Sequence, residues 1–291
     1  MNNSIKIQTS LALPTKSIQK KIDVFHLRKN KLTSLPPGQL PDDLHQKILK
    51  VLNHAAETYS FFGVESEIEK IPRDATMVCG PSYVSEQHPQ PLDSTGRPMF
   101  PVLQADLDWV GLVTGRRFKR QILQLWWSSF DVRGELVIIP KEYVDLSMAK
   151  AVLLPDDVLY EALNWIPFDW TPGNRGTAYL ISGCKSVGIT FPSFAWVLDD
   201  YETSEVHPDI WDLICEVSED YPFNTRPRGS NKFIFQLFGR FKTHSCSPWD
   251  LGSEMCFLHT PQWSQGMMDA NIFMESNVDG VIDGFDFGFG R

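Results

Sequence analysis

Four residues near the C-terminal end of the sequence have types and spacing that could bind a metal ion. His244 and Cys246 form a His-x-Cys pair, and Cys256 and His259 form a Cys-x-x-His pair. A zinc site needs four ligands that converge tetrahedrally, usually from tight turns. However, Cys256 and His259 fall in a predicted strand over 254–259, where an offset of three residues places side chains on opposite faces. We therefore expect no metal site and no cofactor.

Cys184 is the strongest candidate nucleophile, because the neighbouring Lys185 could lower the pKa of its thiol. His207 or His259 could then act as the general base. The sequence contains no Gly-x-Ser-x-Gly elbow, and no cysteine and histidine occur together in a recognisable catalytic setting. We therefore interpret Cys184 as a loop cysteine and expect that the protein is not an enzyme.

A basic segment that follows Gly111 and Gly115 is the closest approach to a phosphate-binding loop. It lacks the four-residue gap before Gly-Lys that a P-loop requires. We predict a solvated turn between strands; a salt-bridging patch for an acidic partner is the second interpretation and a nucleic-acid contact the third. The basic residues concerned are Arg116, Arg117, Lys119 and Arg120.

An acidic loop with one aromatic residue is the leading candidate for a partner-binding surface. It contains Asp199, Asp200, Tyr201 and Glu202, and Trp170 in another predicted loop is the second candidate. A tyrosine beside carboxylates would supply both an anchor and electrostatic steering toward a basic partner. The alternatives are a solvated loop for the acidic segment and, for Trp170, a ring that covers the protein's own core.

A second stretch near the C-terminus is also rich in carboxylates. Asp279, Asp283 and Asp286 are separated by glycines but lack the alternating ligands and closing glutamate of a calcium loop. We predict a solvated loop here, with an acidic binding surface as the alternative.

Composition and charge limit the class of protein. The chain has 291 residues, a formal net charge of −9 at pH 7 and 42 % hydrophobic residues, which is typical of a globule with a sizeable core. Because duplex-binding proteins gain affinity from lysine and arginine contacts with phosphates, we expect no nucleic-acid partner. Five scattered cysteines do not resemble a disulfide framework, and no apolar run reaches the roughly 18 residues of a membrane span. We expect a cytoplasmic protein without a membrane partner.

We expect an N-terminal extension over 1–40 and an α+β domain over 41–291. The extension is polar and basic, and we predict a loosely ordered docking arm, with a nucleic-acid arm as the alternative. A helix is predicted over 41–59, because Leu44, Ile48 and Val51 follow helical spacing. Further helices are predicted over 155–163 and 207–217. Strands are predicted over 100–107, 121–127, 135–139, 177–181, 191–198, 232–238 and 254–259.

Three predicted strands carry a glutamine between apolar neighbours. These are Gln104, Gln124 and Gln236. A glutamine on the apolar face of a strand must find hydrogen-bond partners or cost a few kcal/mol. The first interpretation is a structural amide that connects adjacent strands or loops. The second is an amide that faces a ligand.

The order of these features indicates an internal duplication. The segment 79–84 leads to the strand of Gln104 and then to that of Gln124, whereas 187–194 leads to the strand of Gln236 and then to that of Phe257. We therefore predict duplicated antiparallel β-sheets with flanking helices, arranged about a pseudo-twofold axis.

The same residues resemble the YwqG-like family of bacterial proteins, over roughly 41–274. The segment 91–107 is similar to the family pattern Pro-x-Asp-x-x-Gly-x-Pro-Met followed by Leu-Gln-x-Asp-Leu, and 79–84 is similar to its Gly-x-Pro-Tyr segment. The segment 187–194 looks like Gly-Gly-Tyr-Pro-x-Phe with one glycine lost, and 235–238 and 255–258 look like its closing strands. The resemblance implies an α+β domain with duplicated antiparallel sheets and no agreed reaction, and members often look like immunity proteins encoded beside toxins.

Together these observations predict a non-enzymatic immunity protein that neutralises a cognate bacterial toxin by occluding its active site. An acidic inhibitor would complement a toxin cleft that is basic because it binds an anionic substrate. The alternative is an enzyme or small-ligand-binding protein with a pocket between the two β-rich halves, lined by Gln104 and Gln236.

Overall fold

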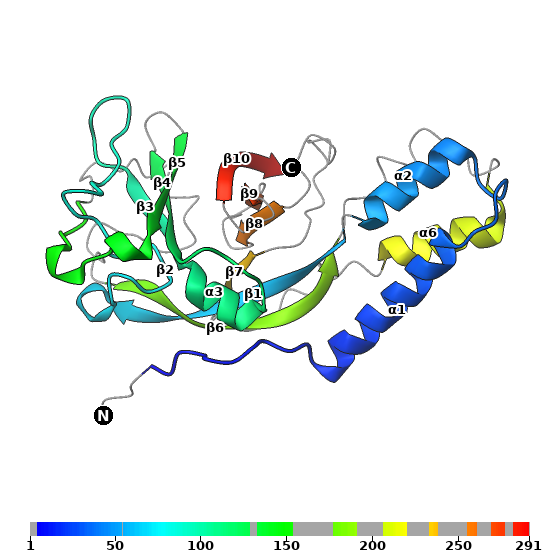
Figure 1. The fold of residues 1–291 in the computed structure, drawn as a ribbon, viewed down its shortest axis with the longest axis horizontal. Coiled ribbons are helices and arrows are strands. Elements are labelled where there is room, and N and C mark those ends of the chain that lie inside the picture. Colours follow the sequence, from blue (N-terminus) through cyan, green and yellow to red (C-terminus); the bar gives the residue numbers. More distant parts are fainter. Residues whose placement is uncertain are drawn as a thin grey trace.

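A large antiparallel sheet and a lobe of three helices make up the described part of the chain (Figure 1). The computed structural model describes residues 5–53, 55–128, 133–153, 177–190, 206–219, 233–237, 255–260, 269–276 and 282–290. This combination of an antiparallel sheet with segregated helices confirms the predicted α+β class.

Ten described strands form one sheet in the order β10-β9-β8-β7-β1-β6-β2-β3-β4-β5. The two edge strands, β5 and β10, approach each other, so the sheet is strongly curled (Figure 1). The strands are β1 (Ala56–Glu67), β2 (Met77–Val78), β3 (Phe100–Asp106), β4 (Gln121–Ser128), β5 (Arg133–Pro140), β6 (Thr177–Thr190), β7 (Phe233–Leu237), β8 (Met255–Thr260), β9 (Asp269–Ser276) and β10 (Ile282–Gly290).

The long pair β1 and β6 occupies the centre of the sheet. Their antiparallel register runs from Ala56 opposite Thr190 to Glu67 opposite Thr177. The free edge of β1 pairs with β7, and the free edge of β6 pairs with β2. The first strand of the chain is therefore flanked only by strands from the second half of the sequence.

The predicted helix over 41–59 is wrong beyond its first part. The helix α2 (Asp42–Asn53) buries Leu44, Ile48 and Val51 as expected, but β1 begins at Ala56. The residues from Thr58 to Phe62 are β-branched, aromatic or serine, and such residues favour a strand when neighbouring strands can pair with them. Tertiary pairing therefore overrides the helical periodicity that continues from α2.

The lobe is built from α1 (Lys16–Thr33), α2 and α6 (Pro208–Glu219), and it projects to one side of the sheet (Figure 1). Its core includes Phe25, Leu32, Ile48 and Ile214, all buried. The expectation of a loosely ordered arm is wrong for 16–33, which form α1. The helix starts at Thr15, whose hydroxyl accepts a hydrogen bond from the backbone N–H of Ile18 at 3.3 Å. Its narrow apolar stripe was insufficient to predict a helix from sequence.

The segment 5–15 is extended and crosses the outer side of β6 and α3 (Leu107–Thr114). The Gln8 backbone N–H donates to the Ser182 carbonyl at 2.7 Å, and the Cys184 N–H donates to Gln8 Oε1 at 2.9 Å. The Trp109 indole donates to the Gln8 carbonyl at 2.8 Å, and the Ala12 N–H donates to the Val113 carbonyl at 2.7 Å. These bonds fasten the N-terminal segment to both elements.

Most of the other predicted elements that fall in the described residues are present. Six predicted strands correspond to β3, β4, β5, β6, β7 and β8, although β6 is longer than expected, and the helix predicted over 207–217 corresponds to α6. The strands β1, β2, β9 and β10 were not predicted. The loop predicted around Asp283 and Asp286 is wrong because both residues lie in β10, and Asp279 lies outside the described residues. The predicted strand 191–198 and helix 155–163 lie outside the described residues.

The strand β1 pairs with β6 and β7, which come from the second half of the chain, and β6 pairs with β1 and β2, which come from the first half. The two halves of the chain should therefore depend on each other for folding. We expect fragments 1–153 and 154–291, expressed separately, to lack cooperative unfolding, since unpaired strand edges and apolar surface remain exposed. Co-expression should yield a complex with the circular dichroism spectrum of the whole chain. Cooperative thermal unfolding of either fragment alone would contradict this interdependence.

Candidate functional site

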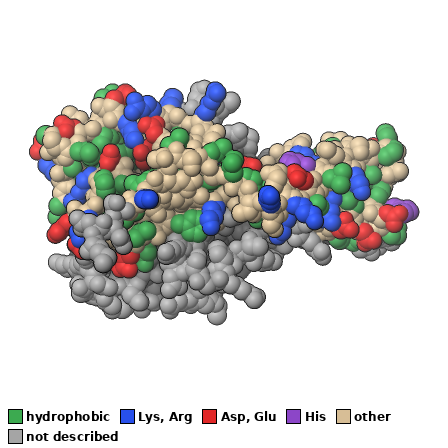
Figure 2. All heavy atoms as spheres, turned by 90° about the horizontal axis from the view of Figure 1, so that it is seen from below, with side chains coloured by type: hydrophobic (Ala, Val, Ile, Leu, Met, Phe, Trp, Pro, Cys, Tyr) green, Lys and Arg blue, Asp and Glu red, His purple; other side chains and the backbone are tan. Residues whose placement is uncertain are grey.

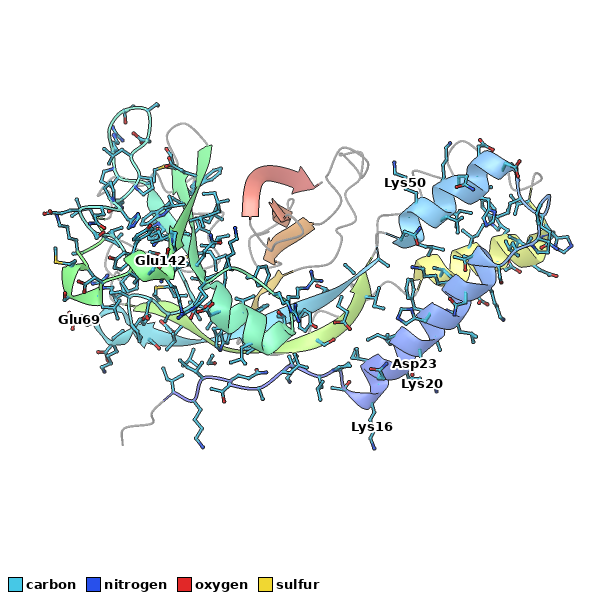
Figure 3. The ribbon with its side chains drawn as sticks, in the orientation of Figure 1. Lys16, Lys20, Asp23, Lys50, Glu69 and Glu142 are labelled. Atoms are coloured by element: carbon cyan, nitrogen blue, oxygen red, sulfur yellow. The ribbon has the colours of Figure 1, made fainter. Side chains whose placement is uncertain are left out.

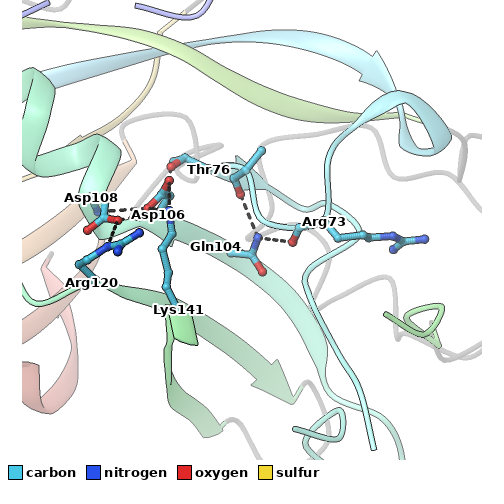
Figure 4. A network of polar contacts seen from close by, with 8 residues as sticks. Arg73, Thr76, Gln104, Asp106, Asp108, Arg120 and Lys141 are labelled. Carbon is cyan, nitrogen blue, oxygen red and sulfur yellow. Dashed lines mark hydrogen bonds and ion pairs between the residues drawn. The ribbon is translucent and has the colours of Figure 1, made fainter. Parts of the chain in front are cut away.

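The residues predicted to bind a partner lie outside the described residues. This applies to Trp170 and to Asp199, Asp200, Tyr201 and Glu202. The described part of the chain instead shows a polar network at one end of β3, where a buried amide and an ion cluster adjoin (Figure 4). Its members come from β3, α3, β4, the start of η2 (Lys141–Tyr143) and the segment 73–83.

Gln104 is the centre of the buried part of this network and has no solvent-exposed surface. Its Nε2 donates to the carbonyl oxygens of Arg73 at 2.7 Å and Ala75 at 2.9 Å (Figure 4). Its Oε1 accepts from the Tyr83 N–H at 2.7 Å and from Gln124 Nε2 at 2.9 Å. An amide has two donors and two acceptor lone pairs, so this amide is fully bonded.

Gln124 lies opposite Gln104 in the pairing of β3 with β4 and extends the same network. Its second Nε2 hydrogen donates to the Tyr83 carbonyl at 2.6 Å, and its Oε1 accepts from the Trp126 indole at 3.1 Å. The two glutamines therefore hold both polar groups of the Tyr83 peptide. The first interpretation of the glutamines, a structural amide, is confirmed for Gln104 and Gln124.

The segment held by the glutamines has a tight local backbone. Cys79 has a positive φ of 54°, which is uncommon for a residue with a side chain. A Cβ atom on Gly80 would lie 2.5 Å from Met77 Sδ, so only glycine fits against Met77 without displacement. The Tyr83 hydroxyl then accepts a hydrogen bond from the Asp145 N–H at 3.2 Å. The Gly-Pro-Ser-Tyr motif is therefore explained by packing.

An ion cluster lies next to Gln104, at the junction of β3 and α3. Lys141 Nζ is 2.8 Å from the Asp106 carboxylate and 3.5 Å from that of Asp108, and Arg120 Nε is 3.1 Å from Asp108 Oδ2 (Figure 4). Asp106 also caps α3, because its side chain accepts from the Asp108 N–H at 3.0 Å. Two carboxylates thus face two cations, which keeps the cluster balanced in charge.

The sequence reading did not single out Asp106, Asp108 or Lys141. The available signal was an aspartate at the end of a strand and in front of an apolar run, which is typical of a helix N-cap. Because α3 was not predicted, the basic segment after it was interpreted as a turn between strands. That turn follows α3 instead, and the helix ends at Gly115, whose φ of +73° is left-handed.

The thiols of Cys184 and Cys79 are poor nucleophiles. Cys184 lies in β6 rather than in a loop, and burial raises the pKa of its thiol to about 12. Burial likewise raises the pKa of the Cys79 thiol. Lys185 points to the Phe62 ring, with its Nζ 5.3 Å from the ring centroid. Adjacent strand residues face opposite sides of a sheet, so Lys185 does not activate Cys184.

The loop between Pro91 and Met99 is organised by one carboxylate. Asp93 Oδ1 accepts from the Thr95 hydroxyl at 2.6 Å, the Thr95 N–H at 2.8 Å and the Arg97 N–H at 2.9 Å. The hydrogen bond from the Thr95 hydroxyl, together with the two backbone N–H groups, lowers the pKa of Asp93. Gly96 completes the turn with a φ of +81°. The Asp-x-x-Gly motif therefore forms a structural turn.

Comparison with models of known protein families and with curated proteins yields no match. Within the described ranges, no three His, Cys, Asp or Glu side chains come together as metal ligands would. No helix among these residues is long and apolar enough to cross a membrane.

Replacing Gln104 with leucine should destabilise the fold strongly. Gln104→Leu removes the hydrogen bonds that Gln104 makes with the Tyr83 N–H and with the carbonyl groups of Arg73 and Ala75, and it takes one of three bonds from the Gln124 amide. We expect the free energy of unfolding to fall by about 4 kcal/mol. Gln46→Leu at an exposed position of α2 is the control and should change it by less than about 0.5 kcal/mol. Urea unfolding measures both. Equal stabilities of the two variants would show that the network contributes little.

Asp93 should make the fold sensitive to acid. Its folded pKa lies below its ordinary value of about 3.9, so its stabilising effect is complete above that value and is lost as the pH falls through the folded pKa. We expect Asp93→Asn to be less stable than the wild type at neutral pH and to lose less stability between pH about 4 and pH about 2. Urea unfolding across this range is the measurement, with Asp212→Asn on α6 as the control. Parallel curves for wild type and Asp93→Asn would refute it.

Proposed function

We propose that this chain is a non-enzymatic binding protein, and specifically an immunity protein that neutralises a cognate bacterial toxin by occluding its active site. The observation that carries the proposal is the bonding of the polar groups in the network. Gln104 uses all four hydrogen-bonding positions on its own chain, and the carboxylates of Asp106 and Asp108 are paired with cations. These groups maintain the fold, and the proposal therefore assigns the activity to the outer surface and not to this network.

The partner in this proposal is a toxin with a basic surface. The chain carries a net charge of −9, and an acidic inhibitor would be steered electrostatically to a basic cleft. The proposed contact residues are Asp199, Asp200, Tyr201 and Glu202, followed by Trp170. The resemblance to YwqG-like proteins supports the same class of function by association, because such proteins are often encoded beside toxins.

The alternative function was a pocket between the two halves with Gln104 and Gln236 in its lining. Two observations weigh against it. The Gln104 amide has no free donor or acceptor, and β3 is separated from β7, the strand of Gln236, by three other strands. Gln236 itself lies opposite Ser60 of the central strand β1. An enzyme of this kind would therefore need a different set of residues.

We also propose that the sheet consists of two duplicated halves about a pseudo-twofold axis between β1 and β6. The strand order supports this, because exchanging β1–β5 with β6–β10 converts the order into itself read backwards. In this exchange β3 corresponds to β8 and β7 corresponds to β2. The strands of Gln104 and Gln236 therefore occupy different places in the proposed repeat, unlike the matching inferred from sequence.

The proposal is tested with the protein encoded beside this chain. We expect a neighbouring reading frame to be lethal when expressed alone and harmless when co-expressed, and its product to bind this chain at a rate that falls steeply with salt. The variant Asp199→Lys/Asp200→Lys/Glu202→Lys should weaken binding by about 100-fold. The control Glu69→Lys/Glu142→Lys changes two exposed acids that are not among the proposed contacts (Figure 3) and should bind as wild type. If the triple variant still neutralised the toxin and bound it with wild-type affinity, the acidic segment would be excluded as the contact surface. If no neighbouring gene encoded a lethal product, that result would argue against the immunity function.

A further inference from the structure

The N-terminal segment has an unusual distribution of apolar side chains. Its even-numbered residues Gln8 and Ala12 are bonded or packed against β6 and α3, whereas its odd-numbered aliphatic residues face solvent. Leu13 is 71 % exposed and Leu11 is 47 % exposed, and Leu112 of the adjacent α3 is 52 % exposed. Ile5 and Ile7 continue the row and are also exposed. An outward-facing aliphatic row on a fastened segment is typical of a surface that contacts something else.

Lysines lie among these aliphatic side chains. Lys6 is within the segment, and Lys16 and Lys20 are one turn apart at the start of α1, where they point away from the helical lobe (Figure 3). None of the three forms an ion pair in the described part of the chain. We call this surface the lysine–leucine face. Its members are Ile5, Ile7, Leu11, Leu13, Lys16, Lys20 and Leu112.

The charge of this region opposes that of the whole protein. Residues 5–33 contain seven lysines and arginines and one acid, Asp23, although the chain carries a net charge of −9. Asp23 accepts a hydrogen bond from Gln19 Nε2 at 2.8 Å. Figure 2 shows several basic side chains along this side of the molecule, with acidic side chains also present toward the helical lobe. The local positive potential therefore attracts an anionic partner to this side.

We propose that the lysine–leucine face binds an anionic lipid surface, as a peripheral contact without any membrane-spanning segment. Exposed leucines enter the boundary between headgroups and acyl chains, while adjacent lysines contact anionic headgroups. The odd-numbered aliphatic residues lie on the outward side of the extended segment, and Lys16 and Lys20 lie at the start of the helix that follows it, which suits a broad planar partner. The hydrogen bonds of Gln8 and Ala12 hold the segment in place before binding, so little ordering entropy is lost.

The residue types favour lipid over other anionic partners. Protein interfaces are enriched in tyrosine, tryptophan and arginine and depleted in lysine. Specific nucleic-acid surfaces use arginine forks and aromatic stacking. The lysine–leucine face combines lysines with aliphatic residues, with the exposed Thr9 between Ile7 and Leu11, and this composition is typical of an interfacial membrane contact. The expectation of no membrane partner considered only apolar runs long enough to span a bilayer, whereas this proposal concerns a peripheral contact, which needs no such run.

Flotation of the whole protein with vesicles tests the proposal. We expect the wild type to float with vesicles of phosphatidylcholine and phosphatidylglycerol at low salt, and not with phosphatidylcholine alone. Each lysine near an anionic surface contributes about fivefold to binding, so Lys16→Glu/Lys20→Glu should weaken partition by at least about 25-fold. Leu13→Ser/Leu112→Ser should weaken it by about tenfold. All four positions are exposed, so the circular dichroism spectra should remain unchanged.

The matched control carries the same change of charge at another place. Lys50→Glu/Lys150→Glu alters exposed lysines of α2 and of the segment after η3 (Leu146–Met148), and Lys50 points to the opposite side of the molecule from Lys16 (Figure 3). This control should partition as wild type. Equal loss in both double variants would overturn the proposal, because net charge would then be the cause. Failure of the wild type to float with anionic vesicles, or binding to duplex DNA or an acidic protein in their place, would also overturn it.

Discussion

The pairing of β1 with β6 is the constraint on which the rest of the structure depends. It joins strands far apart in the sequence, with Glu67 opposite Thr177, and every other described strand is added outward from this pair. The helix α2 leads directly into β1, and the N-terminal segment is bonded to Ser182 and Cys184 of β6. Closing such long loops costs entropy before any contact is gained, so this pairing is expected to form late and to make folding cooperative.

The buried amides solve a different problem, which is to fix an irregular segment against a regular sheet. The segment 73–83 cannot pair as a strand throughout, yet its polar groups are removed from water. Gln104 and Gln124 supply side-chain donors and acceptors that replace a strand partner, and they hold the Tyr83 peptide from both sides. A buried amide is costly unless it is fully bonded, so the network tolerates one arrangement of the segment and excludes others.

The sequence could predict those parts of the fold that depend on local pattern. Short apolar runs between turn signals predicted β3 and β4, and the proline and aspartate at the start of α6 predicted that helix. The strand β1 could not be predicted, because its aromatic run follows an amphipathic helix without a break. The strand β10 could not be predicted either, because its glycines and aspartates disfavour strands until a neighbouring strand supplies hydrogen bonds.

The same distinction applies to the site. That Gln104 is a structural amide follows from a polar side chain on an apolar strand, but its partners depend on how 73–83 folds back, which no local pattern encodes. The role of Asp106 could be predicted only once α3 was known. The contact of Lys141 with Asp106 depends on the strand pairing that brings the end of β5 beside the end of β3. Electrostatic contacts between distant segments are decided by topology, so a sequence pattern supplies candidates and not pairs.

The distribution of charge leads to one further step. A net charge of −9 describes the average field of the whole molecule. In physiological salt the screening length is about 8 Å, so a binding partner at the surface is influenced mainly by the charged side chains closest to it. The basic N-terminal region and the acidic remainder can therefore act toward different partners at the same time. The proposed toxin contacts include Asp199, Asp200 and Glu202, and the proposed lipid contacts include Lys16 and Lys20. The two partners would therefore use different side chains. Their separation in the sequence allows the two proposed contacts to be altered independently.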